Sequence, residues 1–213
     1  RNASGGWIYH YIAWRFRSRL WKAFCKDIEF WLNEWQPRSK NLLLIGPSGG
    51  YCLPRRFLLQ FESIHCFDPD PFSKKIFKKR YKYLPVQWSQ EELFLKNGTL
   101  DIDQVLPLYQ KFSNHAVLFC NCAGQWPLIY QTNEQELKAF FEQIIKIFPK
   151  GEWASFHDLY SADLRHKVRR LPDIPKNIKT SPKALQSWWT TIGGQEVRDH
   201  LTSTIFSEFD SKK

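Results

Sequence analysis

Short apolar runs alternate with amphipathic stretches along most of the chain. Runs of this length, bounded by polar or glycine-rich segments, are typical of strands in a parallel sheet, which is covered on both faces. The predicted strands are residues 41–45, 63–67, 86–88, 116–120 and 152–157. The predicted helices between them are residues 55–61, 72–81, 101–112 and a stretch up to residue 148 with Thr132 as its N-cap. This alternation predicts an α/β fold with a doubly wound, mostly parallel sheet.

The first 36 residues predict one long amphipathic helix, over residues 7–35. Its apolar positions recur every seven residues and form one stripe, which consists of Trp14, Trp21, Phe24, Ile28, Trp31 and Trp35. Arginine and lysine occupy the other faces of this helix. We expect the stripe to pack on the domain; a basic helix with tryptophans is also suited to an anionic membrane surface or to nucleic acid.

The regular alternation of strands and helices is not evident near the end of the chain. Residues 161–189 are basic and contain proline, and we interpret them as an insertion on the substrate side. Residues 190–213 are expected to supply a last pair of short strands. With 213 residues the chain is long enough for one domain with a sizeable core, so we expect a single domain with its central part at residues 40–160.

The charge and cysteine content of the chain restrict the kinds of partner and compartment that we expect for it. Lys and Arg exceed Asp and Glu by 31 to 21, a net charge of +10 that favours an anionic partner. Five cysteines, an odd number, argue against a fully paired disulfide framework and for a reducing compartment, so a cytoplasmic location is expected. No stretch approaches the roughly 20 apolar residues that span a bilayer, and no secretory signal is evident.

The residues that are candidates for ligand binding lie where strands are expected to end. Ligands in doubly wound sheets bind at the carboxyl ends of the strands. Glycine-rich residues 46–50 follow the first predicted strand, and Asp68 follows the second. Glycine lets the backbone turn sharply near a ligand, and an acid at Asp68 is placed to accept hydrogen bonds from both ribose hydroxyls of a nucleoside. The two features together indicate a nucleoside cofactor.

Each feature also has a purely structural interpretation. The glycines form a tight turn in that case, and Asp68 or Asp70 only caps the helix that follows. Residues 46–50 lack the Lys-Ser/Thr pair of a nucleotide-triphosphate loop, and their spacing differs from the dinucleotide fingerprint.

Three motifs in order resemble a class I S-adenosylmethionine-dependent methyltransferase, over residues 40–160. They are residues 42–50 (LLLIGPSGG), residues 67–68 (FD) and residues 148–158 (FPKGEWASFHD). The resemblance implies a Rossmann-like methyltransferase fold and S-adenosylmethionine as the cofactor. It also implies methyl transfer to an unidentified acceptor.

The resemblance assigns residues to this cofactor. It implies that the glycine loop lines the cofactor with Gly46, Ser48 and Gly50, and that Asp68 binds the ribose. It further implies contacts at the ends of the next two strands: adenine with Ser89 or Gln90, and the transferred methyl group with Asn121 and Cys122. Two features depart from the family pattern, because the loop does not read Gly-x-Gly-x-Gly and the adenine position lacks the common Asp.

One motif is also similar to a motif of a different family. Residues 121–124 (NCAG) are similar to the Asn-Asn-Ala-Gly element of short-chain dehydrogenases, which would imply an NAD(P)-dependent oxidoreductase. That family also requires a Tyr-x-x-x-Lys pair, and none of the eight tyrosines is followed by Lys four positions later.

Methyl transfer to an acceptor mainly requires positioning, with a base only where the acceptor loses a proton. His157, Asp158 and Tyr160, at the end of the fifth strand, are the candidate catalytic residues. Each is equally suited to a structural hydrogen bond. Cys120 and Cys122 have no second pair at metal-ligand spacing, so no metal site is expected.

Basic residues gather in two places, at residues 74–82 and at residues 165–183, the second followed by Trp188 and Trp189. Cations beside aromatic rings suit single-stranded nucleic acid. We expect the first cluster to be a solvated helix face and the second to bind an anionic acceptor, either a small molecule or RNA. A non-catalytic, basic nucleic-acid-binding module on a degenerate version of this fold is the main alternative.

Overall fold

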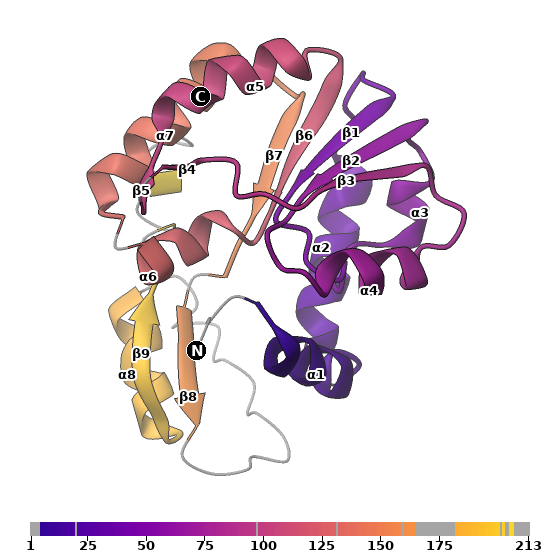
Figure 1. The fold of residues 1–213 in the computed structure, drawn as a ribbon. Helices are drawn as coiled ribbons and strands as arrows, with labels where there is room; N and C mark the ends of the chain where they lie inside the picture. The colour runs from indigo at the N-terminus through magenta and orange to yellow at the C-terminus, as the bar shows by residue number, and fades with distance from the viewer. Residues whose placement is uncertain are drawn as a thin grey trace.

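The structure, a computed structural model, describes residues 5–19, 21–96, 98–130, 132–158, 160–164, 182–200, 202, 205 and 206. Its centre is a five-stranded parallel sheet in the order β3-β2-β1-β6-β7 (Figure 1). The strands are β1 (Asn41–Ile45), β2 (Ser63–Phe67), β3 (Val86–Ser89), β6 (His115–Cys120) and β7 (Trp153–Phe156). The predicted doubly wound α/β fold is confirmed, and it is Rossmann-like: the strand order reverses direction between β1 and β6.

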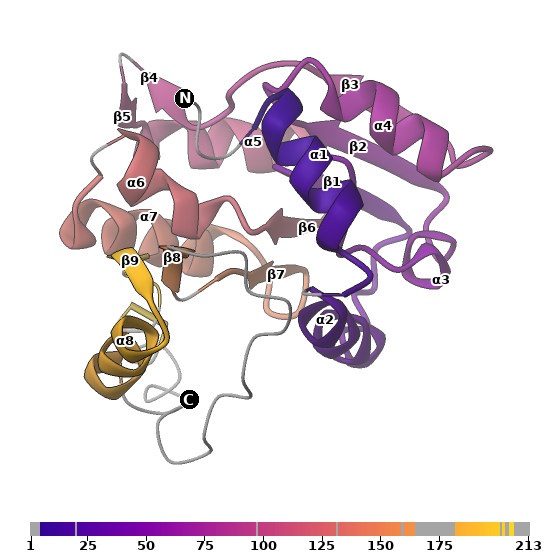
Figure 2. The same cartoon turned by 90° about the horizontal axis from the view of Figure 1, so that it is seen from below.

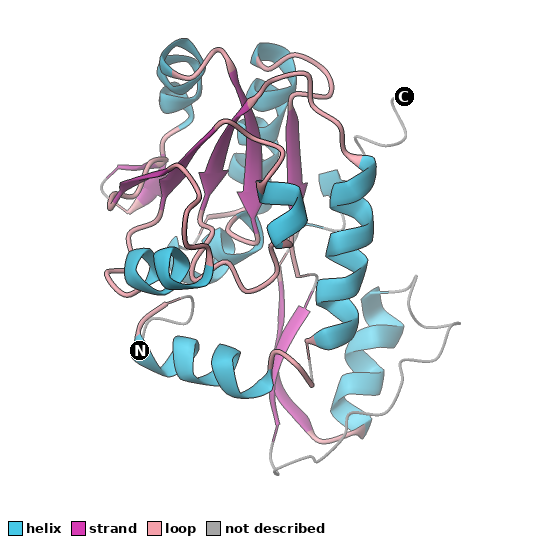
Figure 3. Ribbon diagram, turned by 90° about the vertical axis from the view of Figure 1, so that its right-hand side faces the viewer, coloured by secondary structure: helices cyan, strands magenta, loops and turns pink. Residues whose placement is uncertain are grey.

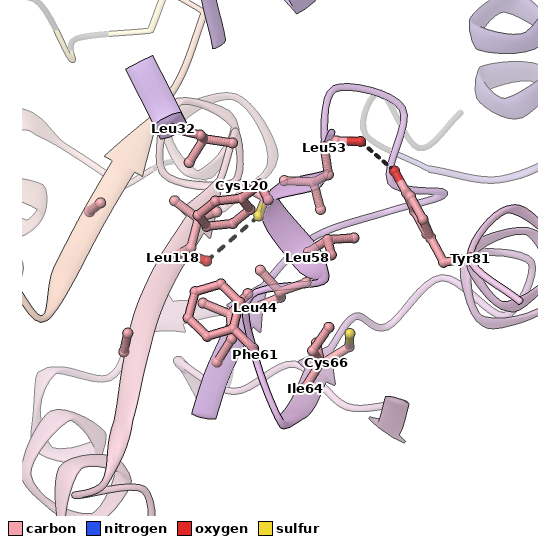
Figure 4. Packing of buried hydrophobic residues seen from close by; sticks show 14 of the residues in the cluster. Leu32, Leu44, Leu53, Leu58, Phe61, Ile64, Cys66, Tyr81, Leu118 and Cys120 are labelled. Carbon is pink, nitrogen blue, oxygen red and sulfur yellow. Dashed lines mark hydrogen bonds between the residues drawn. The ribbon is translucent and has the colours of Figure 1, made fainter. Parts of the chain in front are cut away.

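Helices cover both faces of this sheet. One face carries α2 (Lys22–Glu34), α3 (Arg55–Leu58) and α4 (Ser73–Arg80). The other carries α5 (Val105–Lys111), α6 (Trp126–Tyr130) and α7 (Glu134–Ile147), with the short 3-10 helices η1 (Ile102–Gln104) and η2 (Ala123–Gln125) before α5 and α6. A hydrophobic core lies on each face of the sheet, and alternate residues of β1 point into one or the other. Leu44 faces α2 and α3, whereas Leu43 faces α5 and α7. Figure 4 shows the first core, in which Leu44 packs among Leu58, Ile64 and Leu118.

The register of the sheet brings the carboxyl ends of its strands to one edge. Ile45 at the end of β1 pairs with Phe67 of β2 and with Phe119 of β6. Phe67 in turn pairs with Ser89 at the end of β3. Segments that are far apart in the sequence therefore start from neighbouring points, as the α/β interpretation requires.

The single helix predicted over residues 7–35 is wrong, because the chain forms two helices. They are α1 (Trp7–Phe16) and α2 (Lys22–Glu34). The backbone N–H groups of Arg19 and Trp21 both donate to the carbonyl of Phe16, which closes a turn between them. The break has a tertiary cause: α2 packs on a sheet face, whereas α1 crosses the carboxyl ends of the strands (Figures 2 and 3).

The predicted apolar stripe holds only for α2. Ile28 and Leu32 are buried there, with Phe24 and Trp31 packed against the core. On α1 the buried residues are His10 and Ala13, and Trp14 is 73% exposed. A seven-residue repeat cannot hold one face across a turn that redirects the chain.

The chain after β7 forms a small unit beside the sheet (Figure 1). β8 (Tyr160–Leu164) pairs antiparallel with β9 (Gly194–Asp199), and α8 (Pro182–Thr191) lies against β9. The expected last pair of strands within residues 190–213 is therefore corrected to one strand, β9, whose partner is β8. Residues 202, 205 and 206 are helical. The insertion predicted at residues 161–189 contains the end of β8 and most of α8, and its residues 165–181 lie outside the described residues.

Two local details also differ from the prediction. The N-cap of α7 is Asn133, not Thr132: the Asn133 side chain accepts from the Glu136 N–H, and the Glu136 carboxylate accepts from the Asn133 N–H. A small hairpin of β4 (Leu95–Lys96) and β5 (Thr99–Leu100) follows β3. Among the described residues, no helix is both long and apolar enough to cross a membrane.

Candidate functional site

Every second residue of the loop after β1, from Gly46 to Gly50, has a positive φ. Gly46, Ser48 and Gly50 have φ angles of 65°, 50° and 68°. These three positions are two apart, and serine stands at the middle one. A left-handed conformation is costly for serine.

The outer two positions need glycine for space as well. A Cβ on Gly46 would lie 2.8 Å from the Cβ of Cys122, and a Cβ on Gly50 would lie 2.5 Å from Cε2 of Tyr81. The Tyr81 hydroxyl is fixed by hydrogen bonds to the carbonyls of Gly50 and Leu53, each 2.6 Å long. The loop is thus held closely against β6 on one side and α4 on the other.

The acid after β2 meets this loop. The Asp68 carboxylate accepts a hydrogen bond from the Ser48 N–H at 2.7 Å through Oδ2, and from the Asp70 N–H at 3.0 Å through Oδ1. Only 5% of Asp68 is exposed. Burial raises the pKa of this carboxyl to about 6, and the backbone hydrogen bonds of Ser48 and Asp70 oppose the rise. The two features predicted to act together are in direct contact.

Neither Asp68 nor Asp70 caps α4, since the N-cap is Phe72 and it has no side-chain cap hydrogen bond. Oδ1 of Asp70 accepts from the Phe72 N–H at 2.9 Å, just before α4 begins. The backbone N–H groups that donate to Asp68 are those of Ser48 and Asp70, and the Ser73 side chain at the start of α4 also lowers the pKa of its carboxyl. The acid that the sequence singled out therefore joins β2 to the loop after β1.

Helix α1 covers this part of the site. Nε2 of His10 lies 3.2 Å from Oδ2 of Asp70, and Nδ1 of His10 lies 2.9 Å from the Tyr51 hydroxyl. Asp70 also accepts from the backbone N–H of Gly6. His10 is buried, and burial lowers its pKa in spite of the nearby Asp70 carboxylate. These contacts hold α1 across the loops that follow β1 and β2 (Figure 3).

A cavity of about 50 Å³ lies at the ends of β1, β2 and β6. Of the predicted cofactor residues, Gly46 and Cys122 line it. The remaining lining residues are Ile45, Phe67, Pro69, Glu91, Glu92, Leu93, Phe94, Leu95 and Trp126. The volume holds one or two water molecules and is much smaller than a nucleoside site, which occupies a few hundred Å³. In this structure the cavity beside Gly46 and Cys122 therefore cannot hold a nucleoside.

The predicted adenine contacts do not line this cavity. The Ser89 hydroxyl is 2.9 Å from Nε2 of His65, and the Ser89 carbonyl accepts from the Asp68 N–H. Gln90 is exposed. The next two residues, Glu91 and Glu92, reach the cavity instead. They directly follow Gln90, and the prediction of an adenine contact at Ser89 or Gln90 does not include them.

Asn121 and Asp158 connect the ends of β6 and β7. The Asn121 amide donates to Oδ2 of Asp158, and the Asp158 N–H donates to Oδ1 of Asn121, both at 2.7 Å. Asn121 has a φ of 57°. Burial raises the pKa of Asp158, which the Asn121 hydrogen bond opposes. Cys122 packs against Gly46, and burial raises the pKa of its thiol to about 12.

The other candidate catalytic residues lie differently. The His157 ring stacks on Phe206 with 4.6 Å between centroids, and its buried Nδ1 has no hydrogen-bond partner. Burial, with His200 nearby, lowers the pKa of His157 to about 4, so the ring is neutral at pH 7. Tyr160 is the first residue of β8, and its side chain is outside the described part of the structure. The roles of His157, Asp158 and Tyr160 stay predictions.

The structure describes the first of the two predicted basic clusters but little of the second. Lys74, Lys75, Lys78 and Lys79 on α4 are exposed, as expected of a solvated helix face. Arg80 turns inward, with its guanidinium 5.1 Å from the centre of the Tyr51 ring. Most of the second cluster, at residues 165–183, lies outside the described residues. Across the ranges that the structure does describe, no group of three or more His, Cys, Asp or Glu side chains is arranged to hold a metal ion.

Comparison of the sequence with protein-family models and with curated proteins finds no match. Among solved structures, the chain is similar to magnesium protoporphyrin IX methyltransferase ChlM from Synechocystis PCC 6803 with bound SAH (9% identity, 94% of this chain and 83% of that chain, TM-score 0.48). It is also similar to a DhpI-SAH complex (14% identity, 87% and 83%, TM-score 0.45).

A third similar structure is the N-methyltransferase NodS from Bradyrhizobium japonicum WM9 in complex with S-adenosyl-l-homocysteine (9% identity, TM-score 0.39). That match covers 60% of this chain and spans 56% of the NodS chain. Two of these three proteins are named as methyltransferases.

Proposed function

We propose that this protein is a methyltransferase that uses S-adenosylmethionine and transfers its methyl group to an acceptor that is still to be identified. One observation carries the proposal: Oδ2 of Asp68 accepts from the N–H of Ser48 at 2.7 Å, at the middle of a loop with left-handed backbone at Gly46, Ser48 and Gly50. The glycine-rich loop after β1 and the acid after the neighbouring strand β2 thus meet at the carboxyl edge of the sheet. Nucleoside ligands bind at this edge in this fold class.

The residues at this edge fit the cofactor chemically. A carboxylate has about four acceptor positions, and Asp68 uses two of them for backbone N–H groups. The other positions would accept the two ribose hydroxyls, a role that requires the ionised form and hence a pH above about 6. Glu91, which lines the adjacent cavity, would accept from the adenine amino group. Gly46 and Gly50 give the loop its positive φ angles, and their missing side chains let it pack against Cys122 and Tyr81.

Binding requires the site to open. The cavity of about 50 Å³ is too small for an adenosine group, so α1 or the segment of residues 91–95 has to move. The contacts of His10 with Asp70 and Tyr51 are the ones that this movement of α1 would break. In the proposed cycle, α1 covers the bound cofactor and excludes water from it.

Bound S-adenosylmethionine supplies an electrophilic methyl group, so the chain mainly has to orient the acceptor. Asp158 is the best-placed described residue for this task. Asn121 fixes its carboxylate at the end of β7, next to the strand that leads to Cys122. Because burial raises the pKa of Asp158, its carboxylate would hold a proton from the acceptor more readily than an exposed aspartate.

Titration with S-adenosylhomocysteine, followed by calorimetry, tests the proposal. We expect the wild-type protein to bind it and Asp68→Ala to bind at least about tenfold more weakly, the cost of one lost hydrogen-bonding charged group. Asp103→Ala removes an exposed carboxylate outside the site and should bind like wild type. No binding by the wild type, or undiminished binding by a folded Asp68→Ala variant, would refute the proposal.

A non-catalytic nucleic-acid-binding module is the second candidate, and the four exposed lysines of α4 favour it. Binding of single-stranded RNA that weakens steeply with salt, together with no affinity for S-adenosylhomocysteine, would support this candidate. The oxidoreductase alternative gains no support, since the Asn121 side chain is engaged with Asp158.

A further inference from the structure

Two cysteines from separate elements meet beside the glycine loop. Cys25 is on α2, and Cys52 lies two residues after Gly50. Their Sγ atoms are 3.7 Å apart, and both residues are free thiols of intermediate exposure. A small reagent in solution can therefore reach the pair, and the pair can react within itself.

The surroundings of Cys25 favour its thiolate. When Cys25 is ionised, the Cys52 thiol donates to it, and the guanidinium groups of Arg17 and Arg80 add positive charge. Together they lower the pKa of Cys25 to about 7 against the opposing effect of burial. Arg17 is itself held in place, since its Nε donates to the Tyr51 carbonyl. The thiolate is the form that attacks disulfides, and one with a pKa near ambient pH does so efficiently.

The other cysteines have the opposite environment. Cys66 and Cys120 are buried in the core between the sheet and α2, and burial raises the pKa of both thiols well above the ordinary value. The pKa of Cys122 is also raised. The pKa of Cys52 is raised too, as expected for the proton donor of the pair. Cys25 is thus distinguished from the remaining four.

We propose that Cys25 is a site of thiol–disulfide exchange and that Cys52 is its resolving partner. The co-reactant is a small-molecule disulfide, such as oxidised glutathione. The Cys25 thiolate attacks one sulfur of this disulfide, forms a mixed disulfide and releases one thiolate. Cys52 loses its proton to solvent and attacks the Cys25 sulfur, which releases the second thiolate. Cys25 and Cys52 are oxidised by two electrons, and one small-molecule disulfide is reduced to two thiols.

The product would join two parts of the molecule that now touch without a covalent bond. It would attach α2 to the segment directly after the glycine loop, next to Tyr51, whose hydroxyl contacts His10 of α1. The bond would restrain the loop on which the proposed cofactor site depends. The reaction itself goes beyond the proposed function, because it requires neither cofactor nor acceptor.

The test is treatment of the native protein with oxidised glutathione, followed by mass spectrometry of the intact chain and its peptides. We expect the wild type to lose two hydrogen atoms, with the new bond between Cys25 and Cys52 and with Cys66, Cys120 and Cys122 still free as internal controls. Cys52→Ser should stop at one glutathione on Cys25. Cys25→Ser should react at least about tenfold more slowly, as expected when a thiolate is replaced by less ionised thiols.

The pH dependence supplies an independent measurement. The rate of the first step should rise with a midpoint near pH 7 in the wild type. Arg17→Gln removes one guanidinium and should move this midpoint to higher pH, whereas Arg17→Lys should move it less. A glutathione that stays on Cys25 in the wild type, a disulfide to any other cysteine, or a Cys25→Ser variant that reacts as fast as wild type would overturn the proposal.

Discussion

Replacement of Gly50 by alanine tests why the proposed cofactor loop needs glycine. The change adds one methyl group at a residue whose φ is 68°. That carbon would lie 2.5 Å from Cε2 of Tyr81 and 3.0 Å from the ring of Phe77. Neither ring can yield easily: the Tyr81 hydroxyl makes two hydrogen bonds of 2.6 Å, and both residues are buried.

The expected loss of stability has two parts. The left-handed backbone costs alanine about 1–2 kcal/mol, which is reduced by about 0.4–1 kcal/mol because alanine restricts the unfolded chain. Forcing a methyl group into a packed region adds about 1–3 kcal/mol. We therefore expect Gly50→Ala to destabilise the protein by roughly 1–5 kcal/mol, and each kcal/mol lowers the melting temperature of a domain of this size by about 2–4 °C.

Gly151→Ala is the matched control. Gly151 has a φ of 86°, and a Cβ there would have no atom within 4 Å. It carries the backbone cost alone, so its loss should be about 1 kcal/mol. Urea unfolding followed by circular dichroism measures both variants. If the two lose the same stability, the contact with Tyr81 and Phe77 contributes nothing, and our explanation of the loop is wrong.

Two further predictions concern the end of the sheet. Folding lowers the pKa of His157 from its ordinary 6.5 to about 4, so stability that is present above pH 6.5 is lost as the pH falls toward 4. His157→Phe keeps the ring against Phe206 and should reduce that loss by about 1–3 kcal/mol, measured by urea unfolding at pH 7 and pH 4.5; identical pH dependence of the two proteins would contradict the assignment. Asn121→Gly keeps the positive φ and removes both hydrogen bonds to Asp158, so it should cost about 1–3 kcal/mol. Asn121→Ala should cost about 1 kcal/mol more because it adds backbone strain, and equal stability of the two variants would count against the strained backbone.

The strands of the sheet were predictable because buried parallel strands leave a local signal. A short apolar run between polar breaks marks β1 and β6 most clearly, and β1 and β2 have the predicted bounds without change. The position of Asp68 after such a run was also enough to place it at the carboxyl edge, since every parallel strand ends there. Local sequence therefore determined the fold class and the meeting of Asp68 with the glycine loop.

Helix boundaries and caps were less predictable. Nothing in residues 7–35 marks the turn between α1 and α2, which contains neither proline nor glycine. The N-cap of α7 is Asn133 rather than its neighbour Thr132, and both are residue types that suit this position. Such choices depend on small local energies that packing of the whole chain overrides.

What the sequence determined by itself is the alternation of strands and helices, the edge of the sheet where chemistry gathers, and the acid and glycines found there. The tertiary structure alone decided that Ser48 takes a left-handed conformation, that α1 packs on Asp70 and Tyr51 through His10, and that Cys25 lies against Cys52. The physical reason is the range of the interactions. Hydrophobic periodicity is written in neighbouring residues, whereas these three features depend on contacts between segments that are distant in the chain, and no local pattern encodes them.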